Sequence, residues 1–186
     1  MARPRFATAR ELIGAFPFAR YDLETKPTEQ PPVEFIRSLA ASGAYRDAVT
    51  CCAYLLPRRE AVWWACQCVR AGGKTLLPEE KAALEAAEAW VRTPEEDLRQ
   101  AALGFGTDEP TESAAIWACR AAAFSGGIVS NTPKGPLRAQ PEATARAARA
   151  AVLIAATAVA SREQDKYFRS CIDECLRLLQ RGEDSD

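Results

Sequence analysis

The stretch EATARAARAAVLIAATAVAS, residues 142–161, decides the fold class of this chain. It follows Pro141, contains no Gly, and half of it is Ala, the strongest helix former. Proline is favoured where a helix starts, because the first N–H groups of a helix have no partner within it. The pattern therefore predicts a helix. Its 11 uncharged residues, 150–160, lie between Arg149 and Arg162 and are too few for a membrane span of about 20, so we expect a buried helix and no membrane partner.

The rest of the chain has the same helical character. Its 186 residues include 37 Ala and 15 Leu against only 14 Val and Ile together, so β-branched residues are scarce. Apolar periodicity and prolines that precede it predict a pair of short helices within 33–56 and further helices at 58–71, 79–92, 95–104, 111–124 and 163–181. We therefore predict an all-α fold of about seven to eight helices, packed as helical hairpins in a bundle or a short repeat-like array.

Prolines and charges also suggest the domain organisation. Four prolines between positions 17 and 32 interrupt regular structure, so we expect residues 1–32 to form an N-terminal arm. Residues 33–181 are predicted to form a single α-helical domain, followed by a short acidic tail at 182–186. Residues 125–140 are the longest stretch without a helical pattern inside that domain, and a loop of this length is either functional or mobile.

A short sequence pattern recurs in the helical region at an offset of 53 residues. The run Trp64-Ala-Cys66 aligns with Trp117-Ala-Cys119, and Pro57 aligns with Pro110. This spacing predicts two copies of a three-helix unit, as in stacked helical repeats. The alternative is a chance alignment of Ala-rich helices within a compact bundle.

Charge and composition exclude several function classes. The chain has 24 Lys and Arg against 25 Asp and Glu, a net charge of -1, so it lacks the basic excess that nucleic acid binding needs. It contains no His, which removes Ser-His and Cys-His nucleophile pairs and every His-containing zinc site. We therefore predict no catalytic residues, and we expect the protein not to be an enzyme.

The cysteines favour a reduced, cytoplasmic protein. Their number is odd, and the N-terminal residues lack the apolar run of a secretory signal. No two of them have the Cys-X-X-Cys spacing of a structural zinc site, and free Cys commonly packs as a small hydrophobic residue. We expect no metal and no cofactor, and we assign all seven cysteines to the core: Cys51, Cys52, Cys66, Cys68, Cys119, Cys171 and Cys175.

The segment LPRREAVWWAC, residues 56–66, holds the candidate binding residues. Arg58 and Arg59 fall in the first turn of a predicted helix, where the helix dipole disfavours a cation by about 0.3–1 kcal/mol. Either acidic residues of neighbouring helices pair with these arginines, or the arginines project outward as an anion- or carboxylate-recognition site beside Trp63 and Trp64. The candidate binding residues are Arg58, Arg59, Glu60, Trp63 and Trp64.

The same segment carries a family resemblance. LPRREAVWWAC, preceded by GAYRDAVTCCAYL, resembles the signature of a small uncharacterised family of bacterial all-helical proteins in which an LPRREAVWW run recurs. The resemblance extends over most of residues 8–180. It implies no established activity and no cofactor. It does imply an association with gene clusters for contact-dependent secretion, such as type VI systems, and hence an accessory role.

Two functions remain open from the sequence. The first is a non-enzymatic protein-interaction module: an adaptor, chaperone or immunity-type accessory of a bacterial secretion or toxin system, with another protein as its partner. It is favoured by the missing catalytic constellation and by a repeat-like pattern suited to a concave binding face. The alternative is a small-molecule or carboxylate-binding helical protein, with or without thiol chemistry, centred on the candidate binding residues and the nearby Cys51 and Cys66.

Overall fold

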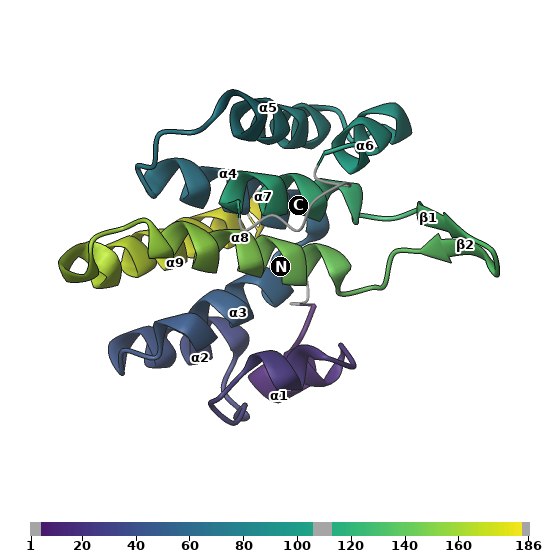
Figure 1. The fold of residues 1–186 in the computed structure, drawn as a ribbon. Helices are drawn as coiled ribbons and strands as arrows, with labels where there is room; N and C mark the ends of the chain where they lie inside the picture. Colours follow the sequence, from purple (N-terminus) through teal and green to yellow (C-terminus); the bar gives the residue numbers. More distant parts are fainter. Residues whose placement is uncertain (1–4, 106–112, 184–186) are drawn as a thin grey trace.

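The computed structural model describes residues 5–105 and 113–183, which form a helical body with one small β-hairpin (Figure 1). The helices are α1 (Ala9–Gly14), α2 (Pro32–Ala41), α3 (Tyr45–Leu55), α4 (Arg58–Ala71), α5 (Pro78–Arg92), α6 (Glu96–Leu103), α7 (Ala114–Ala123), α8 (Ala143–Thr157) and α9 (Ser161–Glu183). A 3₁₀ turn, η1, spans Ala19–Asp22, and the strands are β1 (Ile128–Thr132) and β2 (Gly135–Arg138). The prediction of an all-α fold is confirmed, with nine α-helices in the described residues.

The helix boundaries follow the proline and capping signals. Helix α4 begins directly after Pro57, and α5 begins at Pro78 itself. At the start of α1 the Thr8 hydroxyl accepts a hydrogen bond from the Glu11 N–H at 3.1 Å. Helix α8 stops at Thr157, short of the predicted end at 161, because the chain turns there into α9. No helix in the described residues has both the length and the apolarity to cross a membrane.

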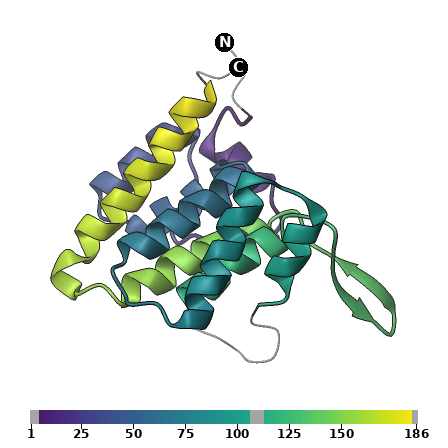
Figure 2. The ribbon, with the colours of Figure 1, turned by 90° about the horizontal axis from the view of Figure 1, so that it is seen from above.

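The helices are stacked in layers around a central group (Figures 1 and 2). Helices α4, α7 and α8 lie in the middle and pack against one another. Helices α5 and α6 pack on α7 from one side, α3 packs on α8 from the other side with α2 and α1 beyond it, and α9 lies against α3 and α4. Helices α7 and α8 bury mostly Ala, whose small side chains let two helices pack closely.

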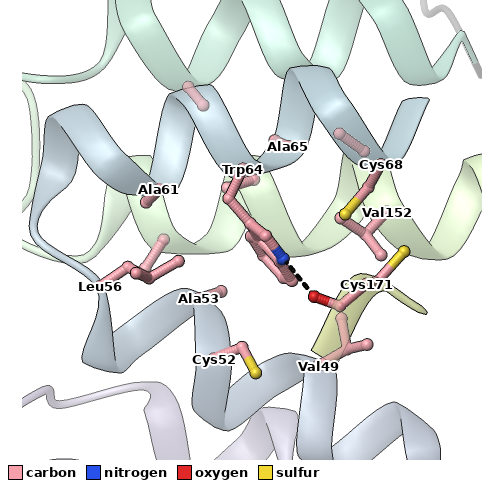
Figure 3. Packing of buried hydrophobic residues seen from close by; sticks show 14 of the residues in the cluster. Val49, Cys52, Ala53, Leu56, Ala61, Trp64, Ala65, Cys68, Val152 and Cys171 are labelled. Carbon is pink, nitrogen blue, oxygen red and sulfur yellow. Dashed lines mark hydrogen bonds between the residues drawn. The ribbon is translucent and has the colours of Figure 1, made fainter. Parts of the chain in front are cut away.

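Trp64 is the largest side chain that is completely buried in the core (Figure 3). Its indole N–H donates a hydrogen bond to the carbonyl oxygen of Cys171 at 2.8 Å, which joins α4 to α9. The Tyr167 hydroxyl lies 3.1 Å from the carbonyl oxygen of Cys68 and 3.3 Å from that of Val152, so it joins α9 to α4 and α8. These bonds satisfy the polar atoms of two large aromatic residues inside an apolar core.

The two Trp-Ala-Cys helices, α4 and α7, lie side by side, but their tryptophans are placed differently. Trp64 is buried, whereas Trp117 is half-buried with the Arg120 guanidinium 4.8 Å from its ring centre. Of the other tryptophans, Trp90 is buried and Trp63 is half-buried. Pro110, the predicted counterpart of Pro57, lies outside the described residues. The repeat therefore stays a prediction.

The segment expected to be an N-terminal arm contains α1 and η1, and it packs on the helical body. Leu12 is completely buried, and backbone N–H groups of α1 donate to the carbonyl oxygens of Thr28 and Gln30. Helix α1 lies ahead of Pro17 and η1 lies between Pro17 and Pro27, and one amphipathic turn is enough to bury Leu12. Residues 1–4 and 184–186, which include most of the expected acidic tail, lie outside the described residues.

Residues 125–140, expected to be a loop, contain the antiparallel β1–β2 hairpin. Thr132 pairs with Gly135 across the turn, and a bulge interrupts the register between Ile128 and Ser130. Gly135 has φ +114°, a conformation that favours glycine. The hairpin extends away from the helices (Figures 1 and 2). Its strands lack an alternation of apolar and polar residues because neither face of the hairpin is buried, so the sequence carried no strand signal.

Candidate functional site

The five candidate binding residues do not form one surface site. Trp64 is buried inside the core with its indole N–H bonded to the carbonyl oxygen of Cys171, so its ring is closed to a ligand. Arg59, Glu60 and Trp63 line a shallow hollow of about 300 Å³ together with the end of α5. Arg58 lines a different cavity, beside Tyr54.

The cations in the first turn of α4 are compensated by backbone carbonyl groups. The Arg59 guanidinium donates to the carbonyl oxygens of Val91 at 2.6 Å and Arg92 at 3.3 Å, the last residues of α5. Arg58 donates to the carbonyl oxygen of Ser125 at 3.0 Å, just beyond α7. Carbonyl groups at a helix C-terminus carry partial negative charge, which is where cations are favoured. These bonds explain how two cations are tolerated in the first turn of α4 without the acidic partners that the sequence suggested.

The seven thiols are free and buried. Burial raises the pKa of Cys119 to about 12 and raises the pKa of Cys51 and Cys66, near the candidate residues, further. A thiol reacts as its thiolate, so these groups are unreactive at neutral pH. In the described part of the chain, no three His, Cys, Asp or Glu side chains are placed to hold a metal ion together.

A partly buried polar cluster that the sequence did not reveal gathers around Asp22. The Tyr54 hydroxyl donates to the Asp22 carboxylate at 2.7 Å, and the guanidinium groups of Arg146 and Arg149 approach it to 3.3 and 3.7 Å. Arg149 also donates to the Thr50 hydroxyl at 2.8 Å. We call these five residues the Asp22 cluster. Burial, together with the bond to Asp22, raises the pKa of Tyr54, so this hydroxyl keeps its proton and remains a donor.

Glu142, next to this cluster at the start of α8, differs from it in having no hydrogen-bond partner. Its side chain is 2% exposed, and neither carboxylate oxygen meets a donor within the described residues. The Thr144 hydroxyl, two residues further on, is also buried without a partner there. Buried polar groups in proteins are nearly always hydrogen-bonded, and an isolated carboxylate is among the most costly exceptions. Glu142 therefore requires an explanation.

Glu142 lines a cavity of about 420 Å³, which we call the Glu142 cavity. Three aromatic side chains line it: Phe18 directly before η1, and Trp117 and Phe124 within and at the end of α7. Arg146 of the Asp22 cluster lines it too. A cavity of this volume, with rings and a few charged groups, has the size and composition of a small-molecule site.

A second buried glutamate, Glu80 in the first turn of α5, shows the ordinary arrangement. Its carboxylate accepts hydrogen bonds from the Leu77 N–H at 2.8 Å, the Lys74 ammonium at 3.0 Å and the Ser113 hydroxyl at 2.8 Å. Burial alone would raise the pKa of Glu80, but these bonds together lower it. Glu80 is thus a satisfied structural residue, in contrast to Glu142.

The root of the hairpin is held by a buried arginine. Arg99 of α6 donates to the carbonyl oxygens of Ala123 at 2.7 Å and Ile128 at 3.1 Å, and it pairs with Glu96. Gly127 has φ +65°, and a Cβ there would lie 2.7 Å from the Arg99 Nη2 atom. The guanidinium hydrogen bonds lower the pKa of Glu96 to about 2. Arg99 therefore fixes how the hairpin leaves the helical body.

The chain belongs to the family of unknown function DUF6931, whose family model matches residues 35–179. No curated protein and no solved structure matches the chain. The expected membership of an uncharacterised family is thereby confirmed. The matched range includes α8, α7 and the hairpin, but it leaves out Phe18 and Asp22.

Proposed function

We propose that this chain is a non-enzymatic protein-interaction module that presents the β1–β2 hairpin to a protein partner. One observation carries the proposal: the hairpin stands outside the helical body, while a buried arginine, Arg99, is committed to holding its root. A buried charge needs several good hydrogen bonds to be tolerated, so such an anchor supports a fixed direction for the hairpin.

The chemistry of the hairpin suits protein recognition. The two large apolar side chains, Ile128 and Leu137, are 36% and 50% exposed. A two-stranded sheet also leaves backbone N–H and C=O groups along its outer edges, which can pair with an extended segment of another chain. Residues 128–138 carry two cations, Lys134 and Arg138, and no acidic side chain. We therefore expect the partner to offer an extended, acidic segment.

The biological setting is a further part of the proposal. The protein would act in the bacterial cytoplasm as an adaptor, chaperone or immunity-type accessory of a secretion or toxin system. The resemblance of the LPRREAVWW run to proteins of such gene clusters supports this setting.

The test is binding to proteins encoded beside the gene in a bacterium that carries it. Each is co-purified with the tagged chain, and any complex is reconstituted from purified components for calorimetry. Replacing residues 128–138 by Gly-Ser-Gly is expected to weaken binding at least tenfold, whereas the double variant R58A/R59A binds as the wild type. Full affinity of the hairpin replacement for a reconstituted partner would contradict the proposal.

A second candidate function is a small-molecule-binding protein. The observation that favours it is a cavity lined by aromatic rings and by Glu142, whose buried carboxylate has no hydrogen bond within the described residues. The site would lie at the start of α8 and not at Arg58 and Arg59, because backbone carbonyl groups already occupy both of those guanidinium groups.

A further inference from the structure

We infer that the Glu142 cavity binds a small aromatic carboxylate: an aromatic ring joined by a short apolar linker to a carboxylate group. The inference rests on the second candidate function, for which it names the class of ligand, and it is independent of the hairpin. Three features of the cavity carry it: the free donors of Arg146, the aromatic and alanine side chains of the wall, and the charges that the wall presents to a ligand.

The guanidinium group of Arg146 has donors to spare. Its Nε atom lies 3.3 Å from the Asp22 carboxylate, and within the described residues its side chain makes no other polar contact. Asp22 is also bound by Tyr54 and approached by Arg149, so it does not depend on Arg146 alone. The Arg146 side chain is 52% exposed, which leaves it accessible to a ligand. The planar group of N–H donors in a guanidinium matches the two oxygen atoms of a carboxylate.

Aromatic rings stand beside these donors. The Arg146 guanidinium lies 6.0 Å from the ring centre of Phe18, and both residues line the cavity. Phe18 is 49% exposed, and the half-buried rings of Trp117 and Phe124 line the same space. Aromatic rings pack favourably on one another, in offset or edge-to-face geometry. A ligand that carries a ring close to its carboxylate can therefore use both parts of the wall at once.

Alanines of α8 leave space in front of these rings. Ala143, Ala147 and Ala150 line the cavity and follow one another at spacings of four and three residues, so they share one face of α8. Helix α7, which carries Trp117, packs directly on α8. The resulting cavity of about 420 Å³ has the size of a small-molecule site. It is large enough for one aromatic ring with a short side chain.

The charges that the wall presents to a ligand favour an anion. Two arginines, Arg146 and Arg149, line the cavity together with one acidic residue, Glu142. Both carboxylate oxygen atoms of Glu142 are buried, so they are not exposed to a ligand in the cavity. The start of α8 also lies at this cavity, and no side chain caps it. The partial positive charge of a helix N-terminus adds to that of the arginines.

The probe is 3-phenylpropanoate, whose ring and carboxylate match the two parts of the wall. Three compounds serve as controls: 3-phenylpropanamide, which is neutral, phenethylamine, which is a cation, and propanoate, which lacks the ring. Titration calorimetry or ligand-observed NMR at pH 7.5 measures binding. We expect 3-phenylpropanoate to bind at least tenfold more tightly than any of the controls.

Four variants test the role of the wall. R146Q is expected to weaken 3-phenylpropanoate binding at least tenfold, whereas R37Q, which removes an exposed cation of α2, leaves it unchanged. E142Q removes a negative charge and is expected to bind at least as tightly as the wild type. A150L keeps Arg146 but fills the cavity from a half-exposed position, and it is expected to abolish binding. If R146Q fails to fold, A150L and the control compounds still decide the matter.

Several results would overturn the inference: no binding of 3-phenylpropanoate at 10 mM, equal binding of the amide or the amine, or full affinity in R146Q or A150L. Binding of the amide or the amine that A150L abolishes would reject the carboxylate but keep the cavity as a small-molecule site. If none of the compounds binds, the second candidate function loses its support as well. The protein with the hairpin replaced is expected to bind 3-phenylpropanoate as the wild type does, so either result leaves the hairpin proposal untouched.

Discussion

Helices α4 and α8 both begin with charged residues, but the surroundings of these residues differ. The cations of α4, Arg58 and Arg59, have the wrong sign for a helix start, yet carbonyl groups at the ends of other helices bind them. Glu142 at the start of α8 has the favourable sign, yet it makes no capping bond and has no donor in the described residues. A charge with the unfavourable sign at a helix start can thus be well compensated, and one with the favourable sign can lack hydrogen-bond partners.

The largest expected effect concerns the buried thiols around α4, whose ionisation opposes folding. Burial raises the pKa of Cys51, Cys52, Cys66, Cys68 and Cys119 above the ordinary value of 9.0. Above pH 9 the unfolded chain loses these protons while the folded chain keeps them. Each thiol then lowers the free energy of unfolding by about 1.4 kcal/mol per pH unit.

We expect stability to be level between pH 7 and 8 and to fall steeply above pH 9. Urea unfolding at several pH values measures this, and the variant C119A should show a shallower fall because one such thiol is missing. A free energy of unfolding that stays constant up to pH 11 would contradict the assignment of these thiols to a closed core.

The second prediction compares how much stability is lost when each of the two adjacent tryptophans of α4 is replaced by alanine. The variant W64A is expected to lose about 3–5 kcal/mol of stability, because it leaves a cavity and removes the bond to Cys171. The matched variant W63A, at a half-buried site, should lose about half of that or less. Urea unfolding of both proteins measures the difference. Equal losses would mean that Trp64 is no more a core residue than its neighbour.

The sequence was sufficient to predict most helices because their limits are local. Pro57 and Gly72 bracket α4, whose observed bounds equal the predicted ones. The Glu142 cavity could not be predicted, since Phe18 and Glu142 are far apart in the chain and meet only through tertiary packing. The sequence pointed to Arg59 because its positive charge is unfavourable in the first turn of a helix. Its partners at the end of α5 could not be predicted, because they depend on how two helices pack.

Replacing each buried glutamate by methionine, which has a similar length, should change stability in opposite directions. E142M is expected to raise the free energy of unfolding by about 1–3 kcal/mol, because it removes a buried polar group without partners. E80M should lower it by a similar amount, since three donors lose their acceptor. Thermal and urea unfolding without added ligand measure both. A loss of stability in E142M would show that Glu142 is a structural residue after all.

The smallest expected effect is the change in the free energy of unfolding caused by R59A. Its sign shows whether Arg59 stabilises the fold or is a free anion-binding residue. If Arg59 stabilises the fold by binding the end of α5, R59A lowers the free energy of unfolding by about 1 kcal/mol. This value is modest because the side chain is exposed. If Arg59 were instead a free anion-binding residue, R59A would gain about 0.3–1 kcal/mol, because a cation leaves the positive end of a helix dipole. Urea unfolding of R59A, beside R37A as an exposed cation on α2, measures the sign. We expect a loss in R59A that R59K restores only in part, since an ammonium group lacks the planar pair of donors that reaches Val91 and Arg92 together.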